Sequence, residues 1–237
     1  MKIECKPLAD TLNILKSLST TTVSIVPSDD GWEFYARDGT NCALAAITMK
    51  KGCFSENYEK WDSFAADMDF LQESIAKRPS VDAELEDGYL KITYEKSRRK
   101  SRLKILDTTP RIFPKIELKN SVAVTSDNLM GLAKDKGYAA ATGADLGLQV
   151  DIEDEGLRMS YVTEQESYED TIDTVMADLP EGPQTAHFSP ELLLPLLRVL
   201  PPGTPTVVAL DSDKPIQITL NTEKYMAALF VAPRIGE

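Results

Sequence analysis

Apolar and polar residues alternate along much of the chain, which is typical of strands with one buried face. Residues 32–36 place Trp, Phe and Ala on one face directly after an Asp-Asp-Gly turn. Residues 157–161 place Leu, Met and Tyr in the same way after a Glu-Asp-Glu-Gly turn. Turns of this kind followed by such alternation predict hairpin strands at both places.

These two stretches belong to a longer duplication. The turn glycines Gly31 and Gly156 are 125 positions apart, and Ile92 and Ile218, in later strand pairs, are 126 apart. The nearly equal offsets indicate two copies of one unit. Each copy reads as helix, hairpin strands, irregular segment, helix and hairpin strands. This order predicts an α+β fold in which the helices pack on a largely antiparallel sheet.

Helical spacing predicts four short helices. The first has leucines three or four positions apart between residues 8 and 18, and the third begins at Ser126-Asp127, a plausible N-cap. The second is expected to start at Phe64-Ala-Ala-Asp and to run to Arg78. The fourth is expected from Phe188 to Arg198, and the strand after it to alternate from Val207 to Ala209.

A connector separates the two copies. Two prolines between residues 106 and 120 exclude a helix or a central strand there, yet three apolar side chains are unusual for a solvated linker. The segment is therefore either pinned onto a sheet or exposes a patch for a partner. The expected organisation is a first domain over residues 1–108, a connector over 109–120 and a second domain over 121–237.

Composition narrows the class of protein. The chain has 237 residues, of which 42% are hydrophobic and 27% charged, as in an ordinary soluble protein. No run approaches the roughly 20 apolar residues of a membrane helix, and no signal peptide is recognisable. Three cysteines without metal-like spacing indicate a reducing, intracellular compartment. The net charge of −12 argues against DNA binding unless the cations are spatially segregated.

No catalytic constellation is recognisable. The single histidine, His187, precedes an expected helix, where a surface or capping role is typical. No Gly-rich phosphate loop, zinc-protease motif or Cys-pair motif occurs. The carboxylates between Glu164 and Asp173 have the chemistry of a Mg²⁺ site, but a solvated acidic loop and strand face is the preferred interpretation. We therefore expect no enzymatic activity, no metal and no cofactor.

Basic residues gather toward the C-terminal halves of the expected helices. They are Lys16, Lys77, Arg78, Lys134, Lys136 and Arg198. Each helix dipole stabilises such a cation by roughly 0.3–1 kcal/mol, which explains every one individually. A shared function requires all four helices to face a common surface. A second basic cluster, residues 96–104, is either a solvated turn or an edge that pairs with acidic residues of another chain.

Five segments resemble one known family in the same order along the chain. They are Arg37-Asp38 through Ala43-Leu44, Glu86–Tyr94, Ile112-Phe-Pro114, Asp213-Lys-Pro-Ile216 and the C-terminal Phe230-Val-Ala-Pro-Arg-Ile-Gly-Glu237. The last resembles the Leu-Ala-Pro-Lys/Arg-Ile-Glu tail of archaeal and eukaryotic DNA sliding clamps, the proliferating cell nuclear antigen (PCNA) family. The similarity covers essentially the whole chain, and the length and the duplication also fit.

The resemblance implies an archaeal-type clamp: a homotrimeric ring with two similar domains per subunit, sheets outside and helices lining a channel for duplex DNA. Such a clamp has no activity of its own and tethers DNA polymerase, the clamp loader and other replication and repair proteins. It would lie in the cytoplasm or nucleoid of an archaeon, or in a eukaryotic nucleus, away from membranes. The family's channel positions map onto the six helix cations, and their DNA contacts would be loose and salt-sensitive.

The resemblance also implies a pocket for partner peptides that carry a glutamine and paired aromatics. Its lining would be Cys42, Leu44, Ile112, Phe113, Pro114, Pro215, Ala232, Pro233 and Ile235. Subunits would join by pairing edge strands over Arg102–Asp107 and Thr171–Asp178. In this contact Arg102 and Lys104 are expected to meet Asp173 or Asp178. Two alternatives stay open: a subunit that assembles only with paralogues, and a metal-dependent nuclease that uses the acidic cluster 164–173.

Overall fold

The computed structural model describes residues 1–55, 58–94, 97–106, 116–135, 137–138, 141, 144 and 147–234, without the side chains of 97–99. The chain forms two compact units. The first unit comprises Met1–Gly39, Ala45–Phe113 and Thr222–Ala227, and the second comprises Thr40–Leu44, Pro114–Asn221 and Ala228–Glu237. No helix in the described ranges combines the length and the apolar composition needed to cross a membrane.

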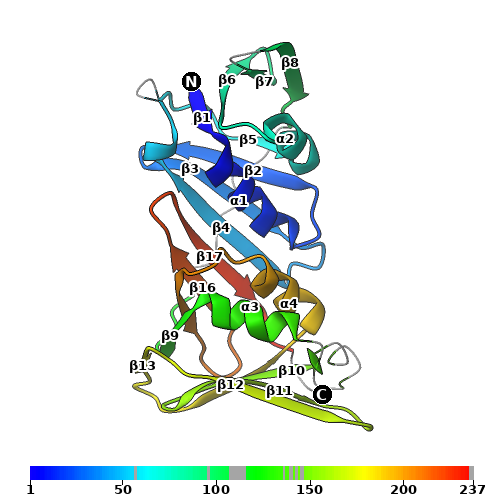
Figure 1. The fold of residues 1–237 in the computed structure, drawn as a ribbon, viewed down its shortest axis with the longest axis vertical. Coiled ribbons are helices and arrows are strands. Elements are labelled where there is room, and N and C mark those ends of the chain that lie inside the picture. The colour runs from blue at the N-terminus through cyan, green and yellow to red at the C-terminus, as the bar shows by residue number, and fades with distance from the viewer. Residues whose placement is uncertain are drawn as a thin grey trace. The chain divides into compact units, whose positions relative to one another are not determined.

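The first unit contains two helices and most of the strands of the N-terminal half (Figure 1). In chain order its elements are β1 (Lys2–Glu4), α1 (Cys5–Lys16), β2 (Thr22–Ser28), β3 (Gly31–Arg37), β4 (Ala43–Lys50), the 3₁₀ helix η1 (Lys51–Cys53), β5 (Phe64–Asp67), α2 (Met68–Ile75), β6 (Ser80–Glu86), β7 (Tyr89–Tyr94) and β8 (Ser97–Lys104). The strands are ordered β1-β6-β7-β8 and β4-β3-β2-β5.

The second unit repeats this plan. Its elements are β9 (Ser121–Thr125), α3 (Ser126–Lys134), β10 (Leu148–Glu153), β11 (Gly156–Val162), β12 (Ser167–Ile172), β13 (Met176–Asp178), β14 (Gln184–Phe188), α4 (Pro190–Arg198), β15 (Pro205–Ala209), β16 (Ile216–Asn221) and the C-terminal part of β17 (Tyr225–Val231). The orders β12-β11-β10-β14 and β9-β15-β16-β17 match those of the first unit, and β13 adds a strand beside β9.

The strand registers repeat with the duplication. Ile25 lies opposite Phe34 in the first unit, and Val150 lies opposite Met159 in the second, so both members of the pair are shifted by 125 positions. The inward residues expected at 32–36 and 157–161 are all buried. Within each unit the two helices pack together, and Figure 1 shows α3 and α4 side by side. The expected α+β class with antiparallel sheets and four helices is confirmed.

Two expected helix starts are wrong, the second helix by four residues and the fourth by two. Phe64–Asp67 is strand β5, which pairs with β2, and the helix begins only at Met68 because the Asp67 carboxylate accepts a hydrogen bond from Phe70 N at 2.8 Å. Phe188 likewise ends strand β14, opposite Leu148. Helix α4 begins at Pro190, where the missing N–H of proline costs no helical hydrogen bond.

Two further expectations are wrong by one residue: the N-cap of the third helix and the buried face of the strand after the fourth helix. Thr125, not Ser126 or Asp127, is the N-cap of α3, and its Oγ1 accepts from Asn128 N at 3.4 Å. In β15 the buried positions are Thr206 and Val208, whereas Val207 is 42% exposed. The turn between β15 and β16 is one residue longer than its counterpart, because Val208 faces Ile218 while Ala83 faces Ile92.

Candidate interaction surfaces

Lys16, the last residue of α1, is paired within its own unit. Its Nζ lies 2.5 Å from Asp69 Oδ1 and 2.9 Å from Gln72 Oε1, both on α2. Gln72 in turn donates from Nε2 to Asn13 Oδ1 at 2.6 Å, which ties the two helices together a second time. The lysine and aspartate side chains remain 39% and 59% exposed, so water and other anions compete for this ion pair.

Lys77 and Arg78 follow the end of α2. Lys77 is exposed and adopts the left-handed backbone conformation with φ of +60°, which turns the chain away from the helix. The Arg78 guanidinium lies over the ring of Tyr94, with Cζ 3.4 Å from the ring centroid, in a cation–π contact. The arginine therefore forms one wall of an open cleft of about 350 Å³ between α2 and the strands β7 and β8.

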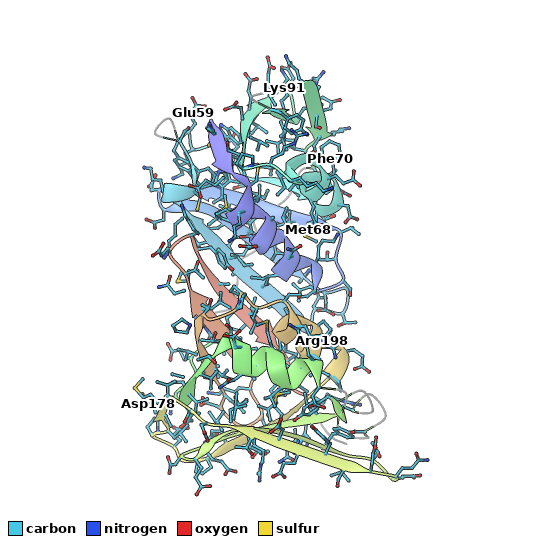
Figure 2. All side chains as sticks on the ribbon, in the orientation of Figure 1. Glu59, Met68, Phe70, Lys91, Asp178 and Arg198 are labelled. Carbon is cyan, nitrogen blue, oxygen red and sulfur yellow. The ribbon has the colours of Figure 1, made fainter. Side chains whose placement is uncertain are left out.

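Arg198, at the end of α4, contacts the end of the neighbouring helix (Figure 2). Its Nε donates to the backbone carbonyl of Ala133 at 2.6 Å, which satisfies one of the carbonyls left without a partner in the last turn of α3. Lys134 is exposed, with its Nζ 3.9 Å from Met130 Sδ, a weak acceptor. Lys136 lies outside the described residues.

The four helices carry almost balanced charge. Their cations are Lys6, Lys16, Lys134 and Arg198, and their carboxylates are Asp10, Asp69, Glu73, Asp127 and Glu191. Three carboxylates occupy first turns and three cations occupy last turns, which is the distribution that the helix dipole favours. Positive charge is therefore concentrated at the C-terminal ends of helices rather than spread over their faces.

The second unit brings the C-terminal tail beside the segment that contains Cys42. Ala232 N donates to the Cys42 carbonyl at 2.7 Å, and Arg234 N donates to the His187 carbonyl at 2.7 Å. Cys42 is exposed, and the other described members of the expected peptide pocket are half-buried: Leu44, Pro215, Ala232 and Pro233. Ile112, Phe113, Pro114 and Ile235 lie outside the described residues.

Gly147 leaves room for the C-terminal tail, a role that the sequence did not reveal. Its φ is +78°, and a Cβ at this position would lie 2.5 Å from the Phe188 carbonyl oxygen and 2.9 Å from Arg234 Nη1. Only glycine tolerates both the conformation and the close approach. A glycine before a strand is too common a pattern to reveal this role, because the tail that it contacts is far away in the sequence.

Two edge strands leave one side without a described partner strand. Strand β8 neighbours only β7, and β12 neighbours only β11. Arg102 and Lys104 are exposed on β8, and the Arg102 guanidinium lies over the ring of Tyr89 with Cζ 4.4 Å from the ring centroid. Asp173 is exposed directly after β12, whereas Asp178 lies on β13 opposite Ser121 (Figure 2). The expected segment 171–178 thus spans two different sheets.

The carboxylates of the acidic cluster are not gathered into one group among the described residues. No group of three or more His, Cys, Asp or Glu side chains in the described part of the chain is arranged to hold an ion. Glu164 and Glu166 lie in the turn between β11 and β12, and Glu169 and Asp170 are successive residues of β12. Successive strand residues point to opposite faces of a sheet, so these two carboxylates are directed apart.

Comparison with known proteins decides the fold. No family model and no curated protein matches the chain, but solved structures do. A chain from the structure of the C-terminal region of FEN-1 bound to A. fulgidus PCNA has a TM-score of 0.82 and 19% identity over 100% of this chain and 98% of that chain. PCNA from Thermococcus kodakaraensis has a TM-score of 0.82 and 14% identity over 98% and 99%.

This chain has the PCNA fold. A chain from the PCNA2–PCNA3 complex of Sulfolobus tokodaii gives the same result, with a TM-score of 0.81 and 15% identity over 99% of both chains. Because each match covers nearly all of both chains, the PCNA fold is present in full and not as a single shared domain. The resemblance noted in the sequence is thereby confirmed at the level of the fold.

Proposed function

We propose that the chain is a subunit of a DNA sliding clamp, a ring that encircles duplex DNA and tethers DNA polymerase and other replication and repair proteins. The observation that carries the proposal is the match to PCNA chains over 98–100% of this chain and 98–99% of theirs. A clamp requires two similar domains and free strand edges at which subunits join. The repeated topology of the two units and the edges of β8 and β12 supply both features.

The two edges differ in charge, which supports assembly from copies of the same chain. The sequence of β8, Ser-Arg-Arg-Lys-Ser-Arg-Leu-Lys, is strongly basic. The sequence of β12, Ser-Tyr-Glu-Asp-Thr-Ile, is acidic, and Asp173 follows it directly. Opposite charges favour contact between a basic edge of one subunit and an acidic edge of the next. We therefore place Arg102 and Lys104 opposite Asp173, with Asp178 at the margin, in a homotrimer.

The DNA-facing role belongs in this proposal to the cations at the helix ends: Lys16, Lys77, Arg78, Lys134, Lys136 and Arg198. Few cations and balanced helix charge suit a protein that slides, because a sliding ring must not hold any phosphate tightly. The pairing of Lys16 with Asp69 and the bond from Arg198 to Ala133 support weak contact of this kind.

Partner recognition belongs in this proposal to a peptide pocket. Its described members are Cys42, Leu44, Pro215, Ala232 and Pro233, all in the second unit. The resemblance adds Ile112, Phe113, Pro114 and Ile235, which lie outside the described residues. The structure of the C-terminal region of FEN-1 bound to A. fulgidus PCNA supports a binding site for a terminal segment on this fold. The clamp itself needs no cofactor and no catalytic group, and its activity is that of the enzymes it tethers.

A second candidate is a subunit that joins only with different clamp chains. The PCNA2–PCNA3 complex of Sulfolobus tokodaii favours it, because chains of the same fold form a heteromer there. The complementary edges of this chain favour the homotrimer instead. The two candidates differ in a simple way: the homotrimer forms from the purified chain alone, whereas an obligate heteromer needs a second chain.

Primer extension on a circular template tests the proposed function. With the clamp loader and DNA polymerase of the source organism, the chain is expected to lengthen the products made on primed circular DNA. Linear DNA with free ends is the control, because a ring slides off it and the stimulation should be lost. Equal stimulation on both templates, or none on either, would contradict a ring. Degradation of DNA with Mg²⁺ that Asp170→Asn abolishes would instead support a nuclease.

A further inference from the structure

The second unit contains a buried carboxylate, Asp211, that is only 4% exposed. Its Oδ1 accepts from the Asn120 backbone N–H at 3.2 Å and from Asn120 Nδ2 at 2.7 Å. The Lys119 backbone N–H lies 3.2 and 3.3 Å from its two oxygens, and Lys214 Nζ lies 3.0 Å from Oδ2. Charge-assisted hydrogen bonds from this many donors hold a carboxylate in one orientation.

The partners of Asp211 belong to two separate segments. Lys119 and Asn120 form the end of the connector, directly before β9, and Lys214 lies in the turn that leads to Pro215 and β16. Lys214 Nζ also donates to the Glu117 carbonyl at 3.3 Å. The connector end and the turn are therefore tied at two points, with the Asp211 carboxylate as the central acceptor.

A third segment completes the network. Asn120 is fully buried, and its side-chain oxygen accepts from Glu181 N at 3.1 Å. The Gln184 side-chain oxygen accepts from both the backbone N–H and the hydroxyl of Ser212, at 2.9 and 3.0 Å. A buried polar network in which the members satisfy one another is rigid, since moving one member leaves several groups without partners. Hydrogen bonds thus hold residues 117–120, 181–184 and 210–215 together.

We propose that Asp211 is a positioning residue for partner-peptide binding: it holds the connector end against the turn that carries Pro215. The inference rests on the proposed function, in which Pro215 lines the peptide pocket. The ligand class is a peptide with a glutamine and paired aromatics. Asp211 is buried and acts through the turn that carries Pro215, so it sets the position of this turn without touching the peptide.

Peptide binding to the full chain, measured by fluorescence anisotropy, tests this role. The probe is a synthetic labelled peptide that contains one glutamine and two aromatic residues. Asp211→Asn is expected to raise the peptide Kd roughly two- to thirty-fold, the range for substitutions that act on a site without contacting the ligand. Lys214→Met, at a half-exposed residue, is expected to give a smaller rise. The double variant should bind no worse than Asp211→Asn alone, because both changes act on one network.

Asp67→Ala is the matched control, since it removes the N-cap carboxylate of α2 in the first unit and leaves the second unit unchanged. Its thermal midpoint is expected to fall while its peptide Kd stays that of the wild type. Wild-type affinity in folded Asp211→Asn overturns the inference. If Asp211→Asn does not fold, an unchanged Kd in Lys214→Met overturns it. A wild-type chain that binds no such peptide refutes the peptide-binding part of the proposed function, and the inference with it.

Discussion

In the proposed clamp, the ion pair between Lys16 and Asp69 limits how readily Lys16 contacts DNA. The two side chains meet at 2.5 Å, and Gln72 accepts a second hydrogen bond from the same ammonium group at 2.9 Å. A phosphate that approaches Lys16 must therefore compete with a carboxylate already in place. Asp69→Asn removes the competing charge, keeps the size of the side chain and is expected to strengthen DNA binding.

The magnitude follows from the exposure of the pair. With side chains 39% and 59% exposed, the pair is a surface ion pair worth about 0.2–1 kcal/mol. Releasing Lys16 should thus raise the affinity for duplex DNA by about 1.4- to 5-fold per subunit. If the freed lysine adopts one phosphate contact, the slope of log K against log salt concentration should steepen by about 0.9 per subunit. Unfolding free energy should fall by no more than about 1 kcal/mol.

Anisotropy of a labelled DNA duplex over a salt series measures both quantities. Lys16→Ala is the matched control, and the double variant Lys16→Ala with Asp69→Asn decides the mechanism. If Asp69 acts by masking Lys16, the double variant shows no gain over Lys16→Ala. A gain that persists without Lys16 would mean that Asp69 acts only through general charge. An unchanged affinity and slope in Asp69→Asn would refute the reasoning altogether.

Three further predictions concern acid stability, the tail and the DNA surface. Burial alone would raise the pKa of Asp211, but hydrogen bonds from Lys214, Asn120 and Lys119 outweigh it and lower the pKa to about 2. The stability from this group is therefore present above the ordinary carboxyl pKa of about 3.8 and is lost as pH falls from about 4 to 2. Over this range the free energy of unfolding should fall by roughly 2 kcal/mol in the wild type, and this loss should be absent in Asp211→Asn. Gly147→Ala should lower the free energy of unfolding, measured in urea, by about 1–3 kcal/mol. Gly39→Ala, where a Cβ meets nothing within 4 Å, should change it by less than about 0.5 kcal/mol. Equal losses in the two variants would contradict the close approach of the tail to Gly147. A fourfold alanine variant replaces Lys16, Lys77, Lys134 and Arg198. It should keep its oligomeric mass yet load poorly on DNA at physiological salt. Normal loading would count against the helix ends as the DNA surface.

The duplication and the core were predictable from sequence because they depend on local periodicity. Alternation at 32–36 and 157–161 placed the buried faces correctly, and the common offset of about 125 positions predicted the repeated topology. Helix starts were less predictable, since the short apolar stretch at Phe64 fits a buried strand as well as a helix. The expected alternation at Val207 is wrong for a single reason. The turn after β15 contains one additional residue, and a shift of one residue exchanges the two faces of a strand.

The functional surfaces were only partly accessible from sequence. The cations at helix ends could be identified, but their partners could not, because Lys16 meets Asp69 53 positions away and Arg198 meets Ala133 65 positions away. Nothing in the sequence distinguishes Asp211 from an ordinary turn aspartate, since its partner Asn120 lies 91 positions earlier. Long-range hydrogen bonds of this kind leave no local pattern, so a buried hub and an exposed turn residue have the same appearance in one sequence.

Sedimentation equilibrium of the purified chain tests ring formation most directly. The subunit mass is 26.2 kDa, and at micromolar concentration we expect a single species of three times that mass. In the proposed trimer, basic β8 of one subunit meets acidic β12 of the next, so the trimer should dissociate more readily as salt rises to 1 M. A mass of 26.2 kDa at every concentration and at low salt would contradict the assembly of a ring from copies of this chain alone.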